Sequence, residues 1–372
     1  VPKALQVASV FVLMLALVPG LPTLPFLAIG SALLLVGRAR ARTKTADEHR
    51  AATEPTAMEQ ARPGTHEPTF VPVVVPWSVE VSADLEPMLD TESQGLRAMA
   101  VKMRQQLFAE LGVPLPAPRV RVRAGLGERQ VALSLHEVPA IVFVVPLEIQ
   151  GDQLIEWVRN RTLGVLRARA SDFLGLAEVQ RLLDELEQYA PATVRNVVPK
   201  PVTLVLLTDV LRRLVEEQIS VRDLRGILEA LSSVAMTEKD PLNLAEYVRS
   251  QMRRAITFRL TRGIGQLDVV LLDSLLEDTV RHAITRTTAG AFLTLPPQAA
   301  RDVLVAVHRA LAAAPDAHSA VILTQPDIRR FVRKLIESEL PDVRVVSFAE
   351  LLPEVSLKPI SRATATFASA SS

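Results

Sequence analysis

The chain has 372 residues, of which 49% are hydrophobic and 4% aromatic, which is enough for roughly two to four structural units with apolar cores. Lys and Arg total 42 against 41 Asp and Glu, and this near-neutral balance gives no electrostatic footprint for nucleic acid. The chain has no Cys, which excludes disulfides, thiol nucleophiles and Cys-ligated zinc, and fits a domain that faces a bacterial cytoplasm.

The first predicted element is a transmembrane helical hairpin at residues 1–40. No charged residue stands between Lys3 and Arg38, and each half of this apolar run is somewhat shorter than the roughly 20 residues of a spanning helix. The predicted turn between the halves contains Pro19, Gly20 and Pro22. Basic residues at both ends predict that both ends lie on the cytoplasmic side. A signal anchor and a buried hairpin remain alternatives, and a first residue of Val rather than Met indicates an upstream part.

A flexible linker is predicted at residues 41–70, which are rich in Ala, Thr, Glu and Pro. Residues 71–153 then predict a first α/β subdomain, with a β-rich run near Trp77 and a helix over residues 92–111. After this helix, residues 119–123 alternate Arg and Val. This alternation predicts an edge strand, where charge discourages unwanted strand pairing; a surface for an anion or RNA is the alternative.

Residues 154–262 predict a helical subdomain, because apolar residues recur at helical spacing along most of this range. Within it, Ser220 precedes a helix and Asp223 stands three residues later, which predicts a capping box. The apolar stripe of that helix leaves a charged outer side with Arg222, Arg225 and Glu229.

Strands and helices alternate over residues 263–360, which predicts a C-terminal α/β subdomain. One predicted helix begins at Pro326 and carries four cations on one side: Arg329, Arg330, Arg333 and Lys334. They are candidates for docking an acidic partner, and an ordinary solvated helix face is the alternative. Residues 361–372 have low complexity and predict a disordered tail.

The sequence shows no pattern typical of a catalytic or metal-binding site. Its six His residues are scattered, and none has the spacing of a metal-binding helix. Two short Gly-x-Gly runs, at residues 125–127 and 263–265, lack the third Gly of a phosphate-binding loop. We therefore expect no catalytic residue, no metal ligand and no cofactor.

Three stretches of this chain closely resemble the export-gate family of flagellar and type III secretion systems: FLGLAEVQRLLDELEQYAP, NVVPKPVTLVLLTDVLRRLVEEQISVRDLRGILEAL and DPLNLAEYVRSQMRRAIT. With gaps, the resemblance runs from the first residues to about residue 360. It implies a multi-subdomain fold of α+β and α/β type. In this fold, the family's last membrane hairpin is followed by thioredoxin-like, trimmed ferredoxin-like, helical and second thioredoxin-like subdomains. The ferredoxin-like part is expected to be trimmed because the span from Val120 to Leu163 is shorter than family members usually have, so no chaperone-docking residues are assigned.

The resemblance also implies a function and partners. It implies an export-gate component of the bacterial inner membrane whose large domain lies in the cytoplasm and forms a nonameric ring. This ring would dock secretion substrates and chaperones beside other export-apparatus membrane proteins, without bond chemistry of its own. A membrane-tethered α/β enzyme or a regulatory domain of a transporter is the alternative, and flagellum and injectisome are not distinguished.

The family's strongest motif is matched by Arg222, Asp223, Arg225 and Glu229. These residues are candidates for contact between ring subunits or for a structural ion-pair network. An ordinary solvated helix face remains the alternative.

Overall fold

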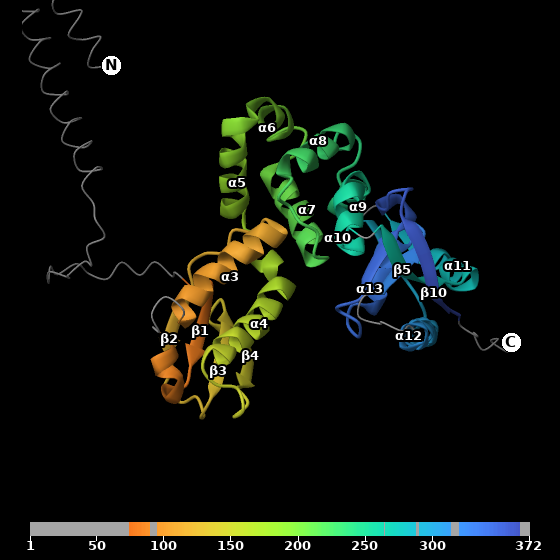
Figure 1. Cartoon of the computed structure of the whole chain (residues 1–372). Coiled ribbons are helices and arrows are strands. Elements are labelled where there is room, and N and C mark those ends of the chain that lie inside the picture. The colour runs from red at the N-terminus through yellow and green to blue at the C-terminus, as the bar shows by residue number, and fades with distance from the viewer. Residues whose placement is uncertain (1–73, 90–94, 264, 288–289, 314–319, 365–372) are drawn as a thin grey trace, which may run out of the picture. The chain divides into compact units, whose positions relative to one another are not determined.

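The computed structural model describes residues 74–89, 95–263, 265–287, 290–313 and 320–364. They all belong to the second of two compact units, Val73–Ser372, and Figure 1 shows their helices and strands. The predicted membrane hairpin with Pro19, Gly20 and Pro22, and the linker at residues 41–70, lie outside the described residues. Among the residues that are described, no helix has the length and apolar character needed to cross a membrane.

A four-stranded sheet forms the first α/β part. Its strands are β1 (Trp77–Val81), β2 (Arg119–Val122), β3 (Gln130–Leu135) and β4 (Val138–Val144), in the order β2-β1-β3-β4. β1 pairs in parallel with β2, whereas β3 pairs antiparallel with both β1 and β4. A 3-10 turn, η1 (Ala83–Met88), follows β1. The helices α3 (Leu96–Leu111) and α4 (Asp152–Ala168) lie against each other beside this sheet (Figure 1).

Helix α3 packs through one apolar face, whose buried residues recur every three or four positions: Leu96, Met99, Met103, Leu107 and Leu111. It ends at Gly112, which has a φ of 77° and therefore takes the left-handed conformation that suits Gly. A Cβ at Gly112 would lie 2.7 Å from the backbone nitrogen of Arg222, and the Val221 N–H donates to the Leu111 carbonyl at 2.8 Å. The first α/β part thus meets the helical part through a close backbone contact.

The edge strand predicted from alternating Arg and Val is confirmed, because β2 is the outermost strand and its residues alternate between exposed and half-buried. Arg121 and Arg123 pair with Glu80 of β1, at 2.6 Å and 3.0 Å. The Glu80 side chain is only 5% exposed. Two arginines of the edge strand therefore compensate a buried carboxylate.

The opposite edge of the sheet is formed by β4, which follows β3 through a two-residue turn. His136 and Glu137 in this turn have φ angles of 49° and 66°, which is typical of a type I′ hairpin. The outer residues of β4 are apolar and exposed, with 65% for Val138, 50% for Val142 and 57% for Val144. No strand or helix is inserted between β4 and α4, a stretch that the structure describes completely.

Six further helices form the middle part: α5 (Leu176–Tyr189), α6 (Pro191–Val197), α7 (Leu204–Glu216), α8 (Leu224–Val234), α9 (Pro241–Gln251) and α10 (Arg253–Thr261). A 3-10 turn, η2 (Ala170–Phe173), leads into them. Side-chain oxygens cap α7, α8 and α9 at Thr203, Asp223 and Asp240. The apolar faces of these helices share one core with the first sheet.

The C-terminal part has a parallel sheet in the order β10-β5-β8-β9. The strands are β5 (Gln266–Leu272), β8 (Val321–Thr324), β9 (Arg344–Ser347) and β10 (Ser356–Ala363). Helices α11 (Ser274–His282), α12 (Pro297–Ala312) and α13 (Arg329–Ile336), the hairpin of β6 (Ile284–Thr287) and β7 (Gly290–Leu293), and the turn η3 (Phe348–Glu350) complete it.

Alternate residues along these strands face two different cores, as the pleat of a strand requires. Val270 and Ile322 join the core with α11, α12 and α13, whereas Val269 and Val321 join a core that includes Leu260 of α10. The sheet therefore has its own helices on one face and the end of the helical part on the other.

Two expectations from the sequence are wrong. The tail predicted over residues 361–372 does not begin at Ser361, since residues through Ala363 lie in β10 and pair with β5. The capping box at Ser220 is not formed, because α8 begins at Leu224 and Asp223 itself is its N-cap residue.

Candidate functional site

The charged side of α8 begins with its cap. Oδ1 of Asp223 accepts a hydrogen bond from the Gly226 N–H at 3.0 Å, which satisfies one of the free donors of the first turn. This hydrogen bond holds the Asp223 side chain at the start of the helix. Asp223 is therefore part of the local structure of α8 and forms no ion pair within the part of the chain that the structure describes.

The other three residues of the motif divide into one contact and one pair. Nη1 of Arg222 donates to the Ala109 carbonyl of α3 at 2.9 Å, so Arg222 joins two parts of the fold. Nε of Arg225 lies 2.8 Å from Oε1 of Glu229, and these side chains are 64% and 52% exposed. The structure thus does not bring the four residues into one network, and it leaves Arg225 and Glu229 as an accessible pair.

A groove lies next to this face of α8. It has a volume of about 620 Å³ and its lining includes Asp223, Gly226, Phe258, Leu352 and Val355. The side chain of Phe258 on α10 is 70% exposed. Accessible ion pairs and exposed aromatic rings are both typical of protein contact surfaces.

The second candidate set does not form the exposed cationic face expected from the sequence. Arg329 is 1% exposed, Arg330 and Arg333 are half-buried, and only Lys334 is well exposed. Arg333 donates to the carbonyls of Val343 and Pro341, at 2.8 Å and 3.0 Å. The predicted docking surface at Arg329, Arg330, Arg333 and Lys334 is therefore not formed as one exposed face, because Arg329 and Arg333 bind partners inside the fold.

Arg329 belongs to a set of buried and half-buried charges that we call the α13 ion network: Glu217, Glu246, Arg249, Arg329 and Glu350. Arg329 donates to Glu217 at 2.5 Å and 2.9 Å and to Oε2 of Glu246 at 2.7 Å. Arg249 contacts Glu217 at 3.1 Å and Glu350 at 2.5 Å. Charges from α13 and η3 thereby meet charges from the end of α7 and from α9.

The network changes the acidity of Glu217. Burial alone would raise the pKa of this carboxyl, but the positive charges of Arg249 and Arg329 outweigh burial and lower the pKa to about 2. The carboxylates of Glu217 and Glu246 raise the pKa of Arg329, although burial alone would lower it. Glu217 and Arg329 are therefore charged at neutral pH, and each charge has a partner of opposite sign.

The signal for this network was present in the sequence of α13. Arg329, Val332 and Ile336 are spaced as i, i+3 and i+7, so the arginine lies on the apolar stripe of the helix. A cation on an apolar stripe needs a buried acid. The acids come from distant parts of the chain, which local pattern could not identify.

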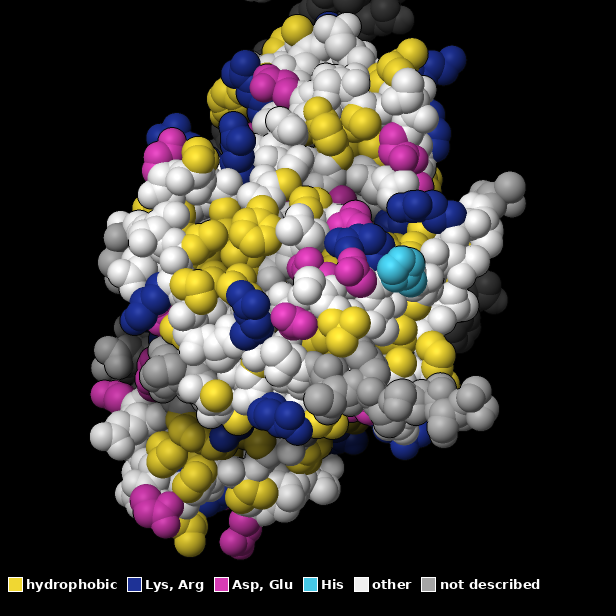
Figure 2. Space-filling view, turned by 90° about the vertical axis from the view of Figure 1, so that its right-hand side faces the viewer, with side chains coloured by type: hydrophobic (Ala, Val, Ile, Leu, Met, Phe, Trp, Pro, Cys, Tyr) yellow, Lys and Arg dark blue, Asp and Glu magenta, His cyan; other side chains and the backbone are white. Residues whose placement is uncertain are grey.

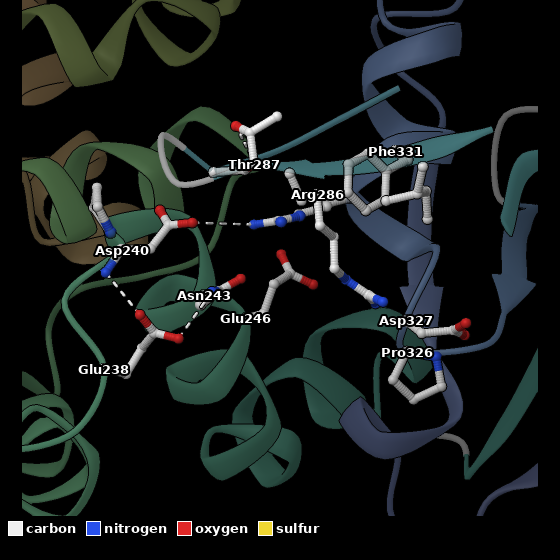
Figure 3. Close-up of a pocket in the computed structure, with 14 residues that line it drawn as sticks. Glu238, Asp240, Asn243, Glu246, Arg286, Thr287, Pro326, Asp327 and Phe331 are labelled. Carbon is white, nitrogen blue, oxygen red and sulfur yellow. Dashed lines mark hydrogen bonds and ion pairs between the residues drawn. The ribbon is translucent and has the colours of Figure 1, made fainter. Parts of the chain in front are cut away.

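Figure 3 shows a cleft of about 750 Å³ between the beginning of α9, the β6–β7 hairpin and the loop before α13. Its acids are held by neighbours: Glu238 accepts from Asn243 at 2.8 Å, and Asp240 accepts from the Leu242 N–H at 2.9 Å. Arg281 lies 2.6 Å from Asp327 and lowers the pKa of that carboxyl. These acids have structural partners, and the cleft offers no pair of free carboxylates for acid–base chemistry.

The face of the molecule drawn in Figure 2 carries Lys and Arg side chains interspersed with Asp, Glu and apolar ones. Among the described residues, no group of three or more His, Asp or Glu side chains could hold a metal ion.

Comparison with known proteins gives a consistent result. A model of the FHIPEP family matches residues 1–154 and 153–356. The low calcium response locus protein D of Yersinia pestis is 29% identical over 425 positions, which cover 97% of this chain and 60% of that protein. This chain thus spans about 60% of the length of that relative.

Solved structures extend the similarity to the fold. The Chlamydia pneumoniae CdsV and CdsO protein complex contains a chain that is 30% identical, with a TM-score of 0.74, covering 80% of this chain and 100% of that one. The nonameric EscV cytosolic domain from the type III secretion system is 26% identical, with a TM-score of 0.68, covering 80% of this chain and 98% of that one. The mixed α/β architecture of several parts is shared with these domains. The chain therefore belongs to the FHIPEP family, the export-gate proteins of flagellar and type III secretion systems.

Proposed function

We propose that this chain is the C-terminal portion of an inner-membrane export gate, whose cytoplasmic ring receives secretion substrates and chaperones and controls their passage. The observation that carries this proposal is the family match across nearly the whole chain, together with the shared fold of a domain solved as a nonamer. The complex of CdsV with CdsO supports contact with other components of the apparatus.

The proposal includes an assignment of the chain's parts. Residues 1–40 form a transmembrane hairpin and residues 41–70 a linker. Residues 71–153 form a thioredoxin-like subdomain with a trimmed ferredoxin-like insertion. Residues 154–262 form the helical subdomain, and a second thioredoxin-like subdomain begins at residue 263. The direct return from β4 to α4 supports a reduced insertion, and the parallel sheet of the C-terminal part supports the last assignment.

In this proposal the ring forms through the outer side of α8. Arg225 and Glu229 are accessible there, and the groove with Phe258 is lined by Asp223 and Gly226 at the start of the same helix. A membrane-tethered enzyme, the alternative, has no specific support from the cleft in Figure 3, because the acidic side chains there are held by structural partners.

The proposal is tested by measuring the mass of the full chain in detergent or lipid nanodiscs by mass photometry. A closed oligomer is expected, with nine copies as in the EscV domain. Monomers at all protein concentrations would contradict ring formation. Turnover of a small molecule by the purified chain would favour the enzyme.

A further inference from the structure

A second cleft, with a volume of about 510 Å³, lies where α4, α10 and β9 approach one another. Part of its wall is apolar, formed by Met252, Ile256, Leu260 and Val343. Its lining also contains five arginines: Arg167, Arg249, Arg259, Arg333 and Arg344. We call this site the arginine cleft.

Three of these arginines already have strong partners. Arg167 forms a forked pair with Glu110, at 2.6 Å and 2.8 Å. Arg249 belongs to the α13 ion network, and Arg333 is bound to backbone carbonyls. Their donors are used inside the fold, so they contribute mainly to the positive field of the cleft.

The other two arginines differ. Within the described residues, the side chains of Arg259 on α10 and Arg344 on β9 donate no hydrogen bond, and no carboxylate oxygen lies within 4.0 Å of their nitrogens. Arg259 is half-buried, whereas Arg344 is more exposed. Each of these guanidiniums offers a planar fork of N–H donors that matches a carboxylate.

The pKa shifts of Arg259 and Arg344 agree with an excess of positive charge in the cleft. Burial lowers the pKa of Arg259, and the nearby charges of Arg344 and Arg167 lower it further, against a smaller opposing effect of Glu110. Burial and Arg262 likewise lower the pKa of Arg344. An incoming anion would relieve this repulsion.

Acids in the lining do not compensate these two arginines. Glu217 is bound to Arg249 and Arg329. Glu216 interacts with Arg213, Asp209, Glu217 and Glu337. Asp342, the remaining acid, lies farther than 4.0 Å from every Arg259 and Arg344 nitrogen.

We propose that the arginine cleft binds a short segment of a partner protein in which an Asp or Glu stands beside an apolar residue. The carboxylate would bridge Arg259 and Arg344, and the apolar side chain would cover Met252, Ile256 and Leu260. A free phosphate would satisfy the cations and leave this apolar wall exposed to water, so the composition of the cleft favours a peptide. All lining residues belong to a single chain, so the inference does not depend on ring assembly.

The test uses the full chain in lipid nanodiscs and a fluorescein-labelled peptide, Gly-Leu-Glu-Ile-Asp-Leu-Gly, with binding followed by fluorescence anisotropy. Two comparison peptides each remove one feature. Gly-Leu-Gln-Ile-Asn-Leu-Gly lacks the charges, and Gly-Ser-Glu-Ser-Asp-Ser-Gly lacks the apolar side chains. We expect the first peptide to bind with saturation and each comparison peptide to bind about tenfold more weakly or worse.

The double variant Arg259→Gln/Arg344→Gln is expected to weaken binding of the first peptide at least about tenfold. Arg301→Gln/Arg309→Gln, which removes two exposed cations of α12, is the control and should leave binding unchanged. Circular dichroism melting of the first variant should not fall, since the substitution removes like charges without native partners.

The inference is overturned if the wild type shows no saturable binding, or if the neutral peptide binds equally well. It is also overturned if the Ser-containing peptide or inorganic phosphate binds as tightly as the first peptide, because the cleft would then be a simple anion site. Loss of binding in a chain that still forms rings would leave the proposed function intact.

Discussion

Arg329 of the C-terminal part and Glu217 of the helical part form a forked ion pair, with nitrogen–oxygen distances of 2.5 Å and 2.9 Å. The two residues are 112 positions apart in the chain, so their contact depends on the tertiary fold. Both are shielded from water, with 1% and 22% of their side chains exposed. Each of these charges compensates the other, so the ion pair joins the two parts.

Replacing Arg329 by Met should strongly destabilise the protein. The substitution keeps much of the side-chain volume but leaves the carboxylates of Glu217 and Glu246 without their main partner. Breaking a buried pair in this way typically costs about 3–5 kcal/mol. Urea denaturation followed by circular dichroism should show this loss, whereas Lys334→Met, at an exposed position of the same helix, should change the free energy of unfolding little. A loss below about 1 kcal/mol for Arg329→Met would mean that the network adds little stability.

Glu217 should make the stability of the protein sensitive to acid. Its pKa is about 2 in the folded chain, below its ordinary value of 4.5, so the unfolded state binds this proton more readily. The stabilisation is fully present above pH 4.5 and is lost as pH falls toward 2. Its size is about 3 kcal/mol by the relation between pKa shift and free energy.

Denaturation curves between neutral pH and pH 2 measure this effect. Glu217→Gln should flatten the dependence on pH in that window, because the titrating group is gone. Glu148→Gln removes an exposed carboxylate and should keep the wild-type slope. If the free energy of unfolding depends on pH equally in the wild type and in Glu217→Gln, other acids determine the sensitivity to acid.

Reversing the charge of Arg225 should weaken ring assembly more than it lowers the melting temperature. The pair with Glu229 is exposed, so its loss has little effect on the fold of one chain. At a subunit contact, the new Glu would place like charges together where opposite charges met. Mass photometry and thermal melting of Arg225→Glu give the two quantities.

The matched control is Arg181→Glu, which reverses a similarly exposed arginine in a pair with Glu178 on α5. Assembly of this variant should resemble that of the wild type. If Arg225→Glu reduces assembly and melting temperature in parallel, Arg225 has a structural role instead.

Asp223→Ala should lower the free energy of unfolding by about 1 kcal/mol, because it removes the hydrogen bond to the Gly226 N–H at the start of α8. Asp223→Asn keeps a side-chain acceptor and should retain most of the stability. Ser220→Ala should have a smaller effect than Asp223→Ala, since Asp223 is the cap residue. A larger effect at Ser220 would contradict this assignment.

Local sequence patterns predicted the elements whose cores are built from regular apolar spacing. The stripe on α3 and the apolar runs of β5 and β8 are examples. β10 was missed because its sequence, SLKPISRA, is largely polar and contains Pro359. Its place as a strand comes from parallel pairing with β5, about 90 residues earlier, which no local pattern encodes.

The candidate sites illustrate the same limit. The exposed pair of Arg225 and Glu229 follows from helical spacing and from their position opposite an apolar stripe. Charge alone suggested that Arg329 was accessible, although its spacing relative to Val332 and Ile336 indicated the reverse. Arg259 and Arg344, which have no hydrogen-bonded or ion-paired side-chain partner among the described residues, could be recognised only after the fold had supplied partners to Arg167, Arg249 and Arg333.

The apolar outer side of β4 has a practical consequence for handling this protein. An edge strand with exposed apolar side chains, here Val138, Val142 and Val144, is a typical site at which β-rich aggregates form. Recombinant material should therefore precipitate through this border at high concentration. A single lysine in place of Val142 should keep it dissolved, while Arg225 and Glu229 on α8 stay as they are.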